Sequence, residues 1–305
     1  MIAQTQSSIR PKLSLAVVAW AVMLAVSVLP NALWHELAGA SPSWLTGAKM
    51  SVLGVMVAAT LFWKNIRPLR NFFIILLAIY VIEEAVTWLR ASAIWQGWFG
   101  TADAPFIVRM WSTQLGRLLV SLAMIGVLLA LGYRRADFFL VRGQLDAPIE
   151  PVRWLGFPRP ETWTRFGLQW SLYIALGLLV FLIVFGRPSW PSFVRAAPLL
   201  PAVLLFAALN AFNEELTYRS TLLAGLERAT GSRQALWNAA LFFGLGHYFG
   251  VPYGVIGVAM ATFLGFLLGK AMLETRGFFW AFFIHFVQDV LIFAFMAAGS
   301  ITPGG

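Results

Sequence analysis

Residues 197–212 read APLLPAVLLFAALNAF, and residues 213–220, which follow directly, read NEELTYRS. The first stretch is apolar enough to form most of a helical crossing of a lipid bilayer. The second stretch places two adjacent carboxylates, a tyrosine and an arginine at the end of that crossing. Charged groups at membrane depth are costly, so they usually pair with one another or mark a functional site. This junction therefore indicates both the fold class and the part of the chain that carries chemistry.

The composition of the whole chain is that of a membrane protein. Of its 305 residues, 60% are hydrophobic and only 11% are charged, whereas soluble domains average about 25% charged residues. Apolar runs that are long enough to cross a bilayer recur along the chain. We therefore expect an all-α, polytopic membrane helical bundle with about nine transmembrane helices, or eight, at approximately 13–33, 44–63, 71–89, 107–132, 167–186, 197–218, 234–249, 253–273 and 277–298.

The distribution of charge predicts an orientation. The net charge is +9, but the basic residues fall in short loops between apolar runs, which indicates membrane topology and anionic lipid, with no nucleic acid as partner. These residues, beginning with Arg10 and Lys12, are concentrated in alternate loops. The positive-inside rule then predicts that the N-terminus is cytoplasmic and the C-terminus external. The chain has no cysteine, which excludes disulfides, thiolate metal sites and cysteine nucleophiles.

The longest hydrophilic segment, 134–166, contains many arginines and the sequence PRP. We expect a cytoplasmic basic loop here, which separates an N-terminal transmembrane region at 1–133, of about four helices, from a C-terminal region at 167–305. In the N-terminal region we expect Glu83 and Glu84 to form a structural ion pair with Arg117, and a proton path is the alternative.

Two other polar features of the N-terminal region have structural interpretations. We expect Lys49 either to snorkel toward the membrane surface or to pair with the same carboxylates. The sequence HEL at 35–37 begins like a zinc motif, but it lacks a second histidine four residues after the first. It is therefore a very weak indication of a metal site.

Polar residues of the C-terminal region share helical faces. Glu215 and Arg219 are four residues apart, so we expect them to pair within one helix. Glu214 points about 100° away, on the face of Asn210 and Tyr218, and we expect it to remain unpaired and to act as a general base.

Two histidines are placed in the same way. Phe243 and His247 are four residues apart, as are His285 and Asp289, so each pair shares a helical face. Glu215 and His247 are equally distant in sequence from Gly231, at the tip between the sixth and seventh spans. If both helices continue to that tip, the two side chains lie at the same height in a hairpin that projects beyond the lipid.

These residues also carry a resemblance to a known family. EELTYR at 214–219 fits the pattern EExxxR, FGLGH at 243–247 fits FxxxH, and HFVQD at 285–289 fits HxxxN/D. In this order the motifs resemble the CPBP family of intramembrane glutamic endopeptidases, which is also called ABI and includes the eukaryotic CAAX prenyl proteases. The resemblance covers residues 197–298, the protease-like core of the C-terminal region.

The resemblance implies a mechanism that needs no cofactor. Glu214 and His247 would activate a water molecule that attacks a peptide carbonyl. His285 and Asp289 would stabilise the oxyanion. Asp289 stands where the CAAX proteases have Asn, so it must be protonated or else orient His285 by accepting its ring N–H.

The resemblance also implies a setting. Glu215 and Arg219 would brace the site. The substrate would be a membrane-associated peptide or protein, and the chain would be integral to the bacterial cytoplasmic membrane. Small residues such as Gly254, Gly257, Gly265 and Gly269 are explained by helix packing within one chain, so the sequence carries no signal for an oligomeric state.

Two other functions fit the same residues. A metal-dependent protease would bind zinc through Glu214, His247 and His285, with or without Asp289, since their nitrogen and oxygen atoms are acceptable ligands. A non-catalytic transporter or immunity scaffold would use the same polar cavity, in which these groups only hold helices together.

Overall fold

The computed structural model describes residues 13–100, 104–153, 161–187 and 189–300. Within these ranges the chain is helical, and seven helices are long and apolar enough to cross a membrane, or eight if a bent pair near the N-terminus forms one span. The expected fold class is confirmed, but the count of nine is not. The span expected at 234–249 corresponds to α11 (Ser232–Gly246), whose 15 residues fall short of the roughly 20 that cross a bilayer.

The chain divides into two compact units. One consists of Met1–Ala78 and Thr221–Phe266, and the other of Ile79–Ser220 and Leu267–Gly305. The helices α4 (Arg70–Ala91) and α12 (Val255–Thr275) contribute residues to both units. The division at the basic loop remains a prediction, and Arg10, Lys12 and residues 154–160 of that loop lie outside the described ranges.

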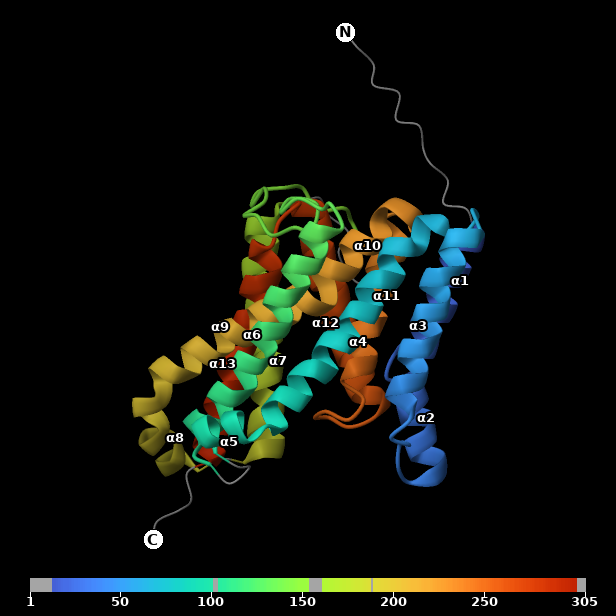
Figure 1. Cartoon of the computed structure of the whole chain (residues 1–305). Helices are drawn as coiled ribbons and strands as arrows, with labels where there is room; N and C mark the ends of the chain where they lie inside the picture. Colours follow the sequence, from blue (N-terminus) through green and yellow to red (C-terminus); the bar gives the residue numbers. More distant parts are fainter. Residues whose placement is uncertain (1–12, 101–103, 154–160, 188, 301–305) are drawn as a thin grey trace. The chain divides into compact units, whose positions relative to one another are not determined.

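The first unit is organised around α1 (Leu13–Val26). This helix packs against α2 (Leu29–Ala38), α3 (Leu45–Phe62), α10 (Thr221–Thr230) and α11, as Figure 1 shows. The hairpin of α10 and α11 turns at Gly231, whose φ of +83° is accessible to glycine at no steric cost. Gly244 of α11 lies directly against Thr262 of α12, where a Cβ would overlap the threonine side chain. The small residue therefore lets these two helices approach closely.

Lys49 of α3 is buried in this unit and does not snorkel. Its side chain is held at the bend between α1 and α2, where Nζ donates to the carbonyl oxygen of Ser27 (2.5 Å) and to the side chain of Asn31. A bend between helices leaves backbone carbonyls without helical partners. The Lys49 ammonium therefore stabilises the break in the helix pair.

The second unit is organised around α13 (Phe279–Gly299). This helix packs against α7 (Trp163–Gly186), α8 (Trp190–Ala196) and α9 (Leu200–Glu214), and α9 also packs against α6 (Phe106–Ala130) (Figure 1). The short helix α5 (Ala93–Phe99) contacts α6. A core of large aromatic and small residues lies where these helices meet, and it comprises Phe106, Ala196, Val203, Phe206, Ala207, Phe293, Ala297 and Ala298. Small residues on α9 and α13 allow these helices to pack closely, and polar groups of the two helices therefore lie near one another.

The segment expected to be a basic loop is folded against the turn between α12 and α13. Gln144 N donates to the carbonyl oxygen of Thr275 (2.8 Å). The two backbones touch at Gly143 and Gly277, where a Cβ on either residue would overlap the other's backbone. The described part of this loop is therefore a docked element of the second unit.

Candidate active site

NEELTYRS lies inside a continuous helical run, Trp190–Thr230. The α-helix α9 ends at Glu214, a π-helical turn follows at Glu215–Ser220, and α10 continues to the tip at Gly231. The expectation that the helix reaches this tip is confirmed. The π-helical turn was not expected; such turns insert an extra residue into an α-helix and are frequent at functional sites.

The two adjacent glutamates have different partners, as the sequence predicted. Glu215 and Arg219 form an ion pair in which both side chains are fully buried. Oε1 of Glu215 also lies 2.7 Å from Nδ1 of His285. Because an ionised carboxylate can only accept, Nδ1 carries the hydrogen, and Glu215 fixes the orientation of the imidazole ring.

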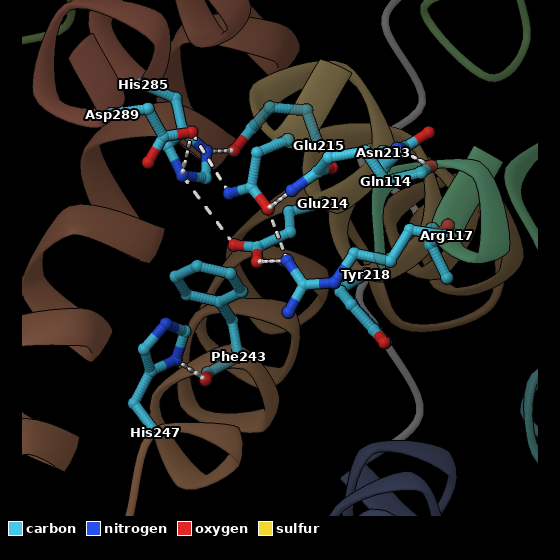
Figure 2. A network of polar contacts seen from close by, with 12 residues as sticks. Gln114, Arg117, Asn213, Glu214, Glu215, Tyr218, Phe243, His247, His285 and Asp289 are labelled. Atoms are coloured by element: carbon cyan, nitrogen blue, oxygen red, sulfur yellow. Dashed lines mark hydrogen bonds and ion pairs between the residues drawn. The ribbon is translucent and has the colours of Figure 1, made fainter. Parts of the chain in front are cut away.

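Glu214 is paired, contrary to the expectation from the sequence. Its Oε1 accepts a hydrogen bond from the Arg117 guanidinium at 2.6 Å, and its Oε2 lies 3.6 Å from Nε2 of His285 (Figure 2). The partner comes from α6, a helix that faces α9. The prediction that Glu214 remains unpaired is wrong, because a facing helix supplies the cation.

The predicted ion pair of Glu83 and Glu84 with Arg117 is also wrong. Glu83 instead accepts a hydrogen bond from the Tyr218 hydroxyl, and Glu84 accepts one from Nε1 of Trp88 in its own helix at 2.8 Å. The arginine at this depth therefore belongs to the Glu214 network.

Asp289 completes the polar cluster. Its Oδ2 accepts a hydrogen bond from Nδ2 of Asn210 (3.0 Å) and lies 3.6 Å from Nε2 of His285. The expected shared face of His285 and Asp289 is confirmed, and so is the position of Asn210 beside them. Glu214, His285 and Asp289 thus converge from α9 and α13 (Figure 2). The orienting contact to His285 Nδ1 comes from Glu215, not from Asp289.

A polar seam on α6 supports the cluster from the other side. Nε2 of Gln114 donates to Oδ1 of Asn210 (3.2 Å), and the Arg117 guanidinium donates to the same oxygen. One turn further, the hydroxyl of Ser121 is 3.1 Å from that of Thr217. Sequence reasoning missed Gln114 and Ser121. Their spacing of three and four residues from Arg117 was the available signal, since it places all three on one helical face.

His247 and Phe243 belong to the first unit, where they contact each other. Nδ1 of His247 is 2.9 Å from the carbonyl oxygen of Phe243, and the two rings are 4.5 Å apart between centroids (Figure 2). The expected shared face is confirmed. A carbonyl oxygen only accepts, so Nδ1 carries the hydrogen, and Nε2 of the neutral ring is a proton acceptor.

The segment after His247 is anchored by the HEL sequence. Oε1 of Glu36 accepts hydrogen bonds from the hydroxyls of Tyr248 (2.9 Å) and Tyr253 (2.5 Å). These bonds stabilise the neutral phenols, and the hydrogen bond to Glu36 raises the pKa of Tyr253 to about 12. The His35 ring packs edge-on against Phe249. HEL therefore has a structural role in this unit.

No group of three or more His, Cys, Asp or Glu side chains is arranged to hold a metal ion in the part of the chain that the structure describes. The nitrogen and oxygen atoms of the cluster are instead occupied with arginine, asparagine and one another.

Residues 196–291 match a family model that is described as type II CAAX prenyl endopeptidase Rce1-like. The matched segment contains the three motifs that carry the resemblance to the CPBP family, so this resemblance is confirmed there. The match implies a protease, and together with the apolar helices it identifies an integral membrane protein. No curated protein and no solved structure matches the chain.

Proposed function

We propose that this chain, which is of the CPBP type over residues 196–291, is an intramembrane glutamic endopeptidase. It would hydrolyse a peptide bond of a membrane-associated peptide or protein. The observation that carries the proposal is the convergence of Glu214, His285 and Asp289 inside the matched segment, on helices that are long enough to cross a membrane.

The charges of the cluster suit a reaction that moves a proton. The cluster contains two guanidinium groups and three carboxylates, those of Arg117, Arg219, Glu214, Glu215 and Asp289. A protein interior of low dielectric constant tolerates such charges only when they are paired, and a proton that moves within the cluster changes which groups are paired.

The proposed chemistry follows from these positions. Glu214 accepts a proton from water while the water oxygen bonds to the peptide carbonyl carbon. The carbonyl oxygen becomes an oxyanion, which a proton donor at His285 Nε2 or Asp289 stabilises. The C–N bond then breaks, Glu214 returns its proton to the leaving amine, and the products are a carboxylic acid and an amine, between which the remaining proton transfers to give a carboxylate and an ammonium. The ion pair with Arg117 holds the Glu214 carboxylate in position for this step.

The resemblance to the CPBP family implies that His247 helps Glu214 to activate water. Its Nε2 is a suitable acceptor, and its contribution is a proposal to be tested by His247→Ala. The proposed reaction needs no cofactor, and a zinc-dependent version at the same residues is the competing chemistry.

The test is a comparison of membrane peptides from cells that express wild type or Glu214→Gln. We expect the variant to accumulate an uncleaved membrane peptide, and Glu84→Gln, a matched change outside the cluster, to behave like wild type. Indistinguishable peptide sets in wild type and Glu214→Gln would refute the proposal.

Two outcomes identify the competing functions. Cleavage that is lost with a strong chelator and restored by zinc indicates the metalloprotease. Substrate flux that persists in Glu214→Gln proteoliposomes indicates a transporter.

A further inference from the structure

A cavity of about 260 Å³ lies beside Glu214, within the second unit. Residues of α4, α6 and the run through α9 and the π-helical turn line it, among them Thr87, Arg90, Arg117, Glu214 and Tyr218. The α4 and α6 walls lie outside the segment that matches the protease family. The N-terminal part of the chain therefore supplies most of the residues that line the space next to the proposed general base.

Arg117 shows that this cavity is accessible. It lies in the middle of α6, a helix that is long enough to span the membrane, yet 45% of its side chain is exposed. An arginine at that depth is tolerated when it faces a polar cavity that admits water or substrate, and not when it faces lipid. The Arg117 guanidinium already pairs with Glu214, and both side chains line the cavity.

Arg90 supplies a second guanidinium to the same cavity. It lies near the end of α4, where an arginine could extend to the membrane surface, but its side chain lies across Gly116 of α6. A Cβ at Gly116 would be 2.9 Å from Cδ of Arg90. The absent side chain of Gly116 is therefore what lets Arg90 reach the cavity.

The charges around the cavity leave Arg90 available. Glu83 accepts a hydrogen bond from the Tyr218 hydroxyl, and Glu214 forms an ion pair with Arg117. Nε of Arg90 is buried and makes no hydrogen bond, and no ion pair of Arg90 with a carboxylate is found among the described residues. A guanidinium that lines a cavity without an anionic partner favours a ligand that carries one.

We propose that this cavity binds a carboxylate of the peptide substrate, with the Arg90 guanidinium as its partner. A guanidinium presents its donors in a fork that matches a carboxylate, which gives both affinity and orientation. The carboxylate can be an acidic side chain or the carboxyl terminus of the peptide. The proposal rests on the proposed function, because it assigns this site to the substrate of the Glu214 cluster.

Binding of defined peptides tests the proposal. The probes are hexapeptides of Leu, Phe and Ala with a neutral fluorophore at the N-terminus, prepared as the free acid, as the C-terminal amide, and as the amide with Glu in the last position. Fluorescence anisotropy measures their affinity for the full chain in nanodiscs of zwitterionic lipid. We expect the free acid, the Glu peptide or both to bind about tenfold more tightly than the neutral amide.

Three variants test whether the preference for a carboxylate depends on Arg90 in this cavity. Arg90→Gln should abolish the preference for a carboxylate, and Gly116→Ala should abolish it with Arg90 still present, because the added methyl displaces the side chain. Arg109→Gln, an equal loss of charge on α6 outside the cavity lining, should retain it. Which of the two charged peptides binds more tightly identifies the source of the carboxylate.

The proposal is overturned if all three peptides bind equally or if Arg90→Gln keeps the preference. It is also overturned if nanodiscs with phosphatidylglycerol abolish the preference, because the site would then belong to a lipid headgroup. Mass spectrometry of the peptides after the titration reports cleavage separately, so a failure of the protease function is distinguished from a failure of this site.

Discussion

At the scale of single residues, the ion pair of Glu215 and Arg219 connects stability to the site. Both side chains are fully buried, and Glu215 also holds Nδ1 of His285. A buried pair of this kind contributes little compared with an apolar pair, but removing one partner leaves an uncompensated charge in the interior.

We therefore expect Glu215→Ala or Arg219→Ala to lower the free energy of unfolding by about 3–5 kcal/mol. Thermal unfolding of the purified protein in detergent measures the effect. The double variant Glu215→Leu/Arg219→Met should lose less than either single variant, because no charge is left behind. Equal stability of wild type and the single variants would contradict the buried pair.

Asp289 permits a test of charge against hydrogen bonding. Its Oδ2 accepts from Asn210, and the side-chain amide of an asparagine in its place would still offer a carbonyl oxygen to that donor. We expect Asp289→Asn to retain cleavage within about tenfold of wild type, and Asp289→Leu to lose about 100-fold, since the leucine removes a polar group from the oxyanion side. Turnover of the identified substrate by purified protein is the measurement. A complete loss in Asp289→Asn would show that the carboxylate charge itself is required.

The sequence predicted the contacts within one helix and missed those between helices. The pairs Glu215–Arg219 and His285–Asp289 follow from a spacing of four residues. The partner of Glu214 does not, because Arg117 is distant along the chain and its helix could face Glu83 equally well. Deciding between those carboxylates requires the rotation of α6 about its axis, which hydropathy does not give.

At the scale of elements, the docked loop depends on the contact of Gly143 with Gly277. A side chain on Gly277 would overlap the facing backbone, and rigid backbone cannot yield as a flexible side chain does. We expect Gly277→Ala to lower the free energy of unfolding by about 1–3 kcal/mol. Gly126→Ala of α6, where a Cβ would meet nothing, is the matched control and should be neutral or stabilising. Thermal unfolding of both variants distinguishes close contact from helix propensity.

The contact that anchors the segment after His247 can be tested by titrating Tyr253. The hydrogen bond to Glu36 raises the pKa of Tyr253 to about 12, above the unfolded value of about 10. The neutral phenol is thus favoured in the folded state, so its stabilising effect is complete below pH ~10 and is lost as pH rises through ~12. In Glu36→Gln we expect tyrosinate absorbance to appear at lower pH than in wild type. Identical titration curves would mean that Glu36 does not hold this segment.

At the scale of the whole molecule, the membrane orientation can be tested by labelling single cysteines. The basic residues of alternate loops predict that the N-terminus and the tip at 231–233 are cytoplasmic. Because the chain has no cysteine, single cysteines can be labelled without background. In sealed, right-side-out vesicles an impermeant maleimide should label Ser41→Cys and leave Ser232→Cys unlabelled until the membrane is opened. The reverse pattern would invert the predicted topology.

Hydropathy and length were sufficient for the all-helical class, since apolar runs of bilayer length leave few alternatives. They overestimated the number of spans at α11, where a 15-residue helix ends at Gly246 and an irregular segment begins. An apolar run does not show where its helix stops. The docking of the basic loop was equally hidden, because it depends on two glycines that meet only in the folded chain.

The π-helical turn at Glu215–Ser220 has a consequence for how such proteins are compared with one another. A related chain that lacks one residue here would form a regular α-helix of nearly the same length. Its side chains beyond the deletion would be rotated by about 100° relative to those before it. In a sequence alignment this difference would appear only as a one-residue gap within a transmembrane helix, which is easily taken for an alignment error. It would in fact separate relatives in which the residues after the turn keep these orientations from relatives in which the same letters face different neighbours.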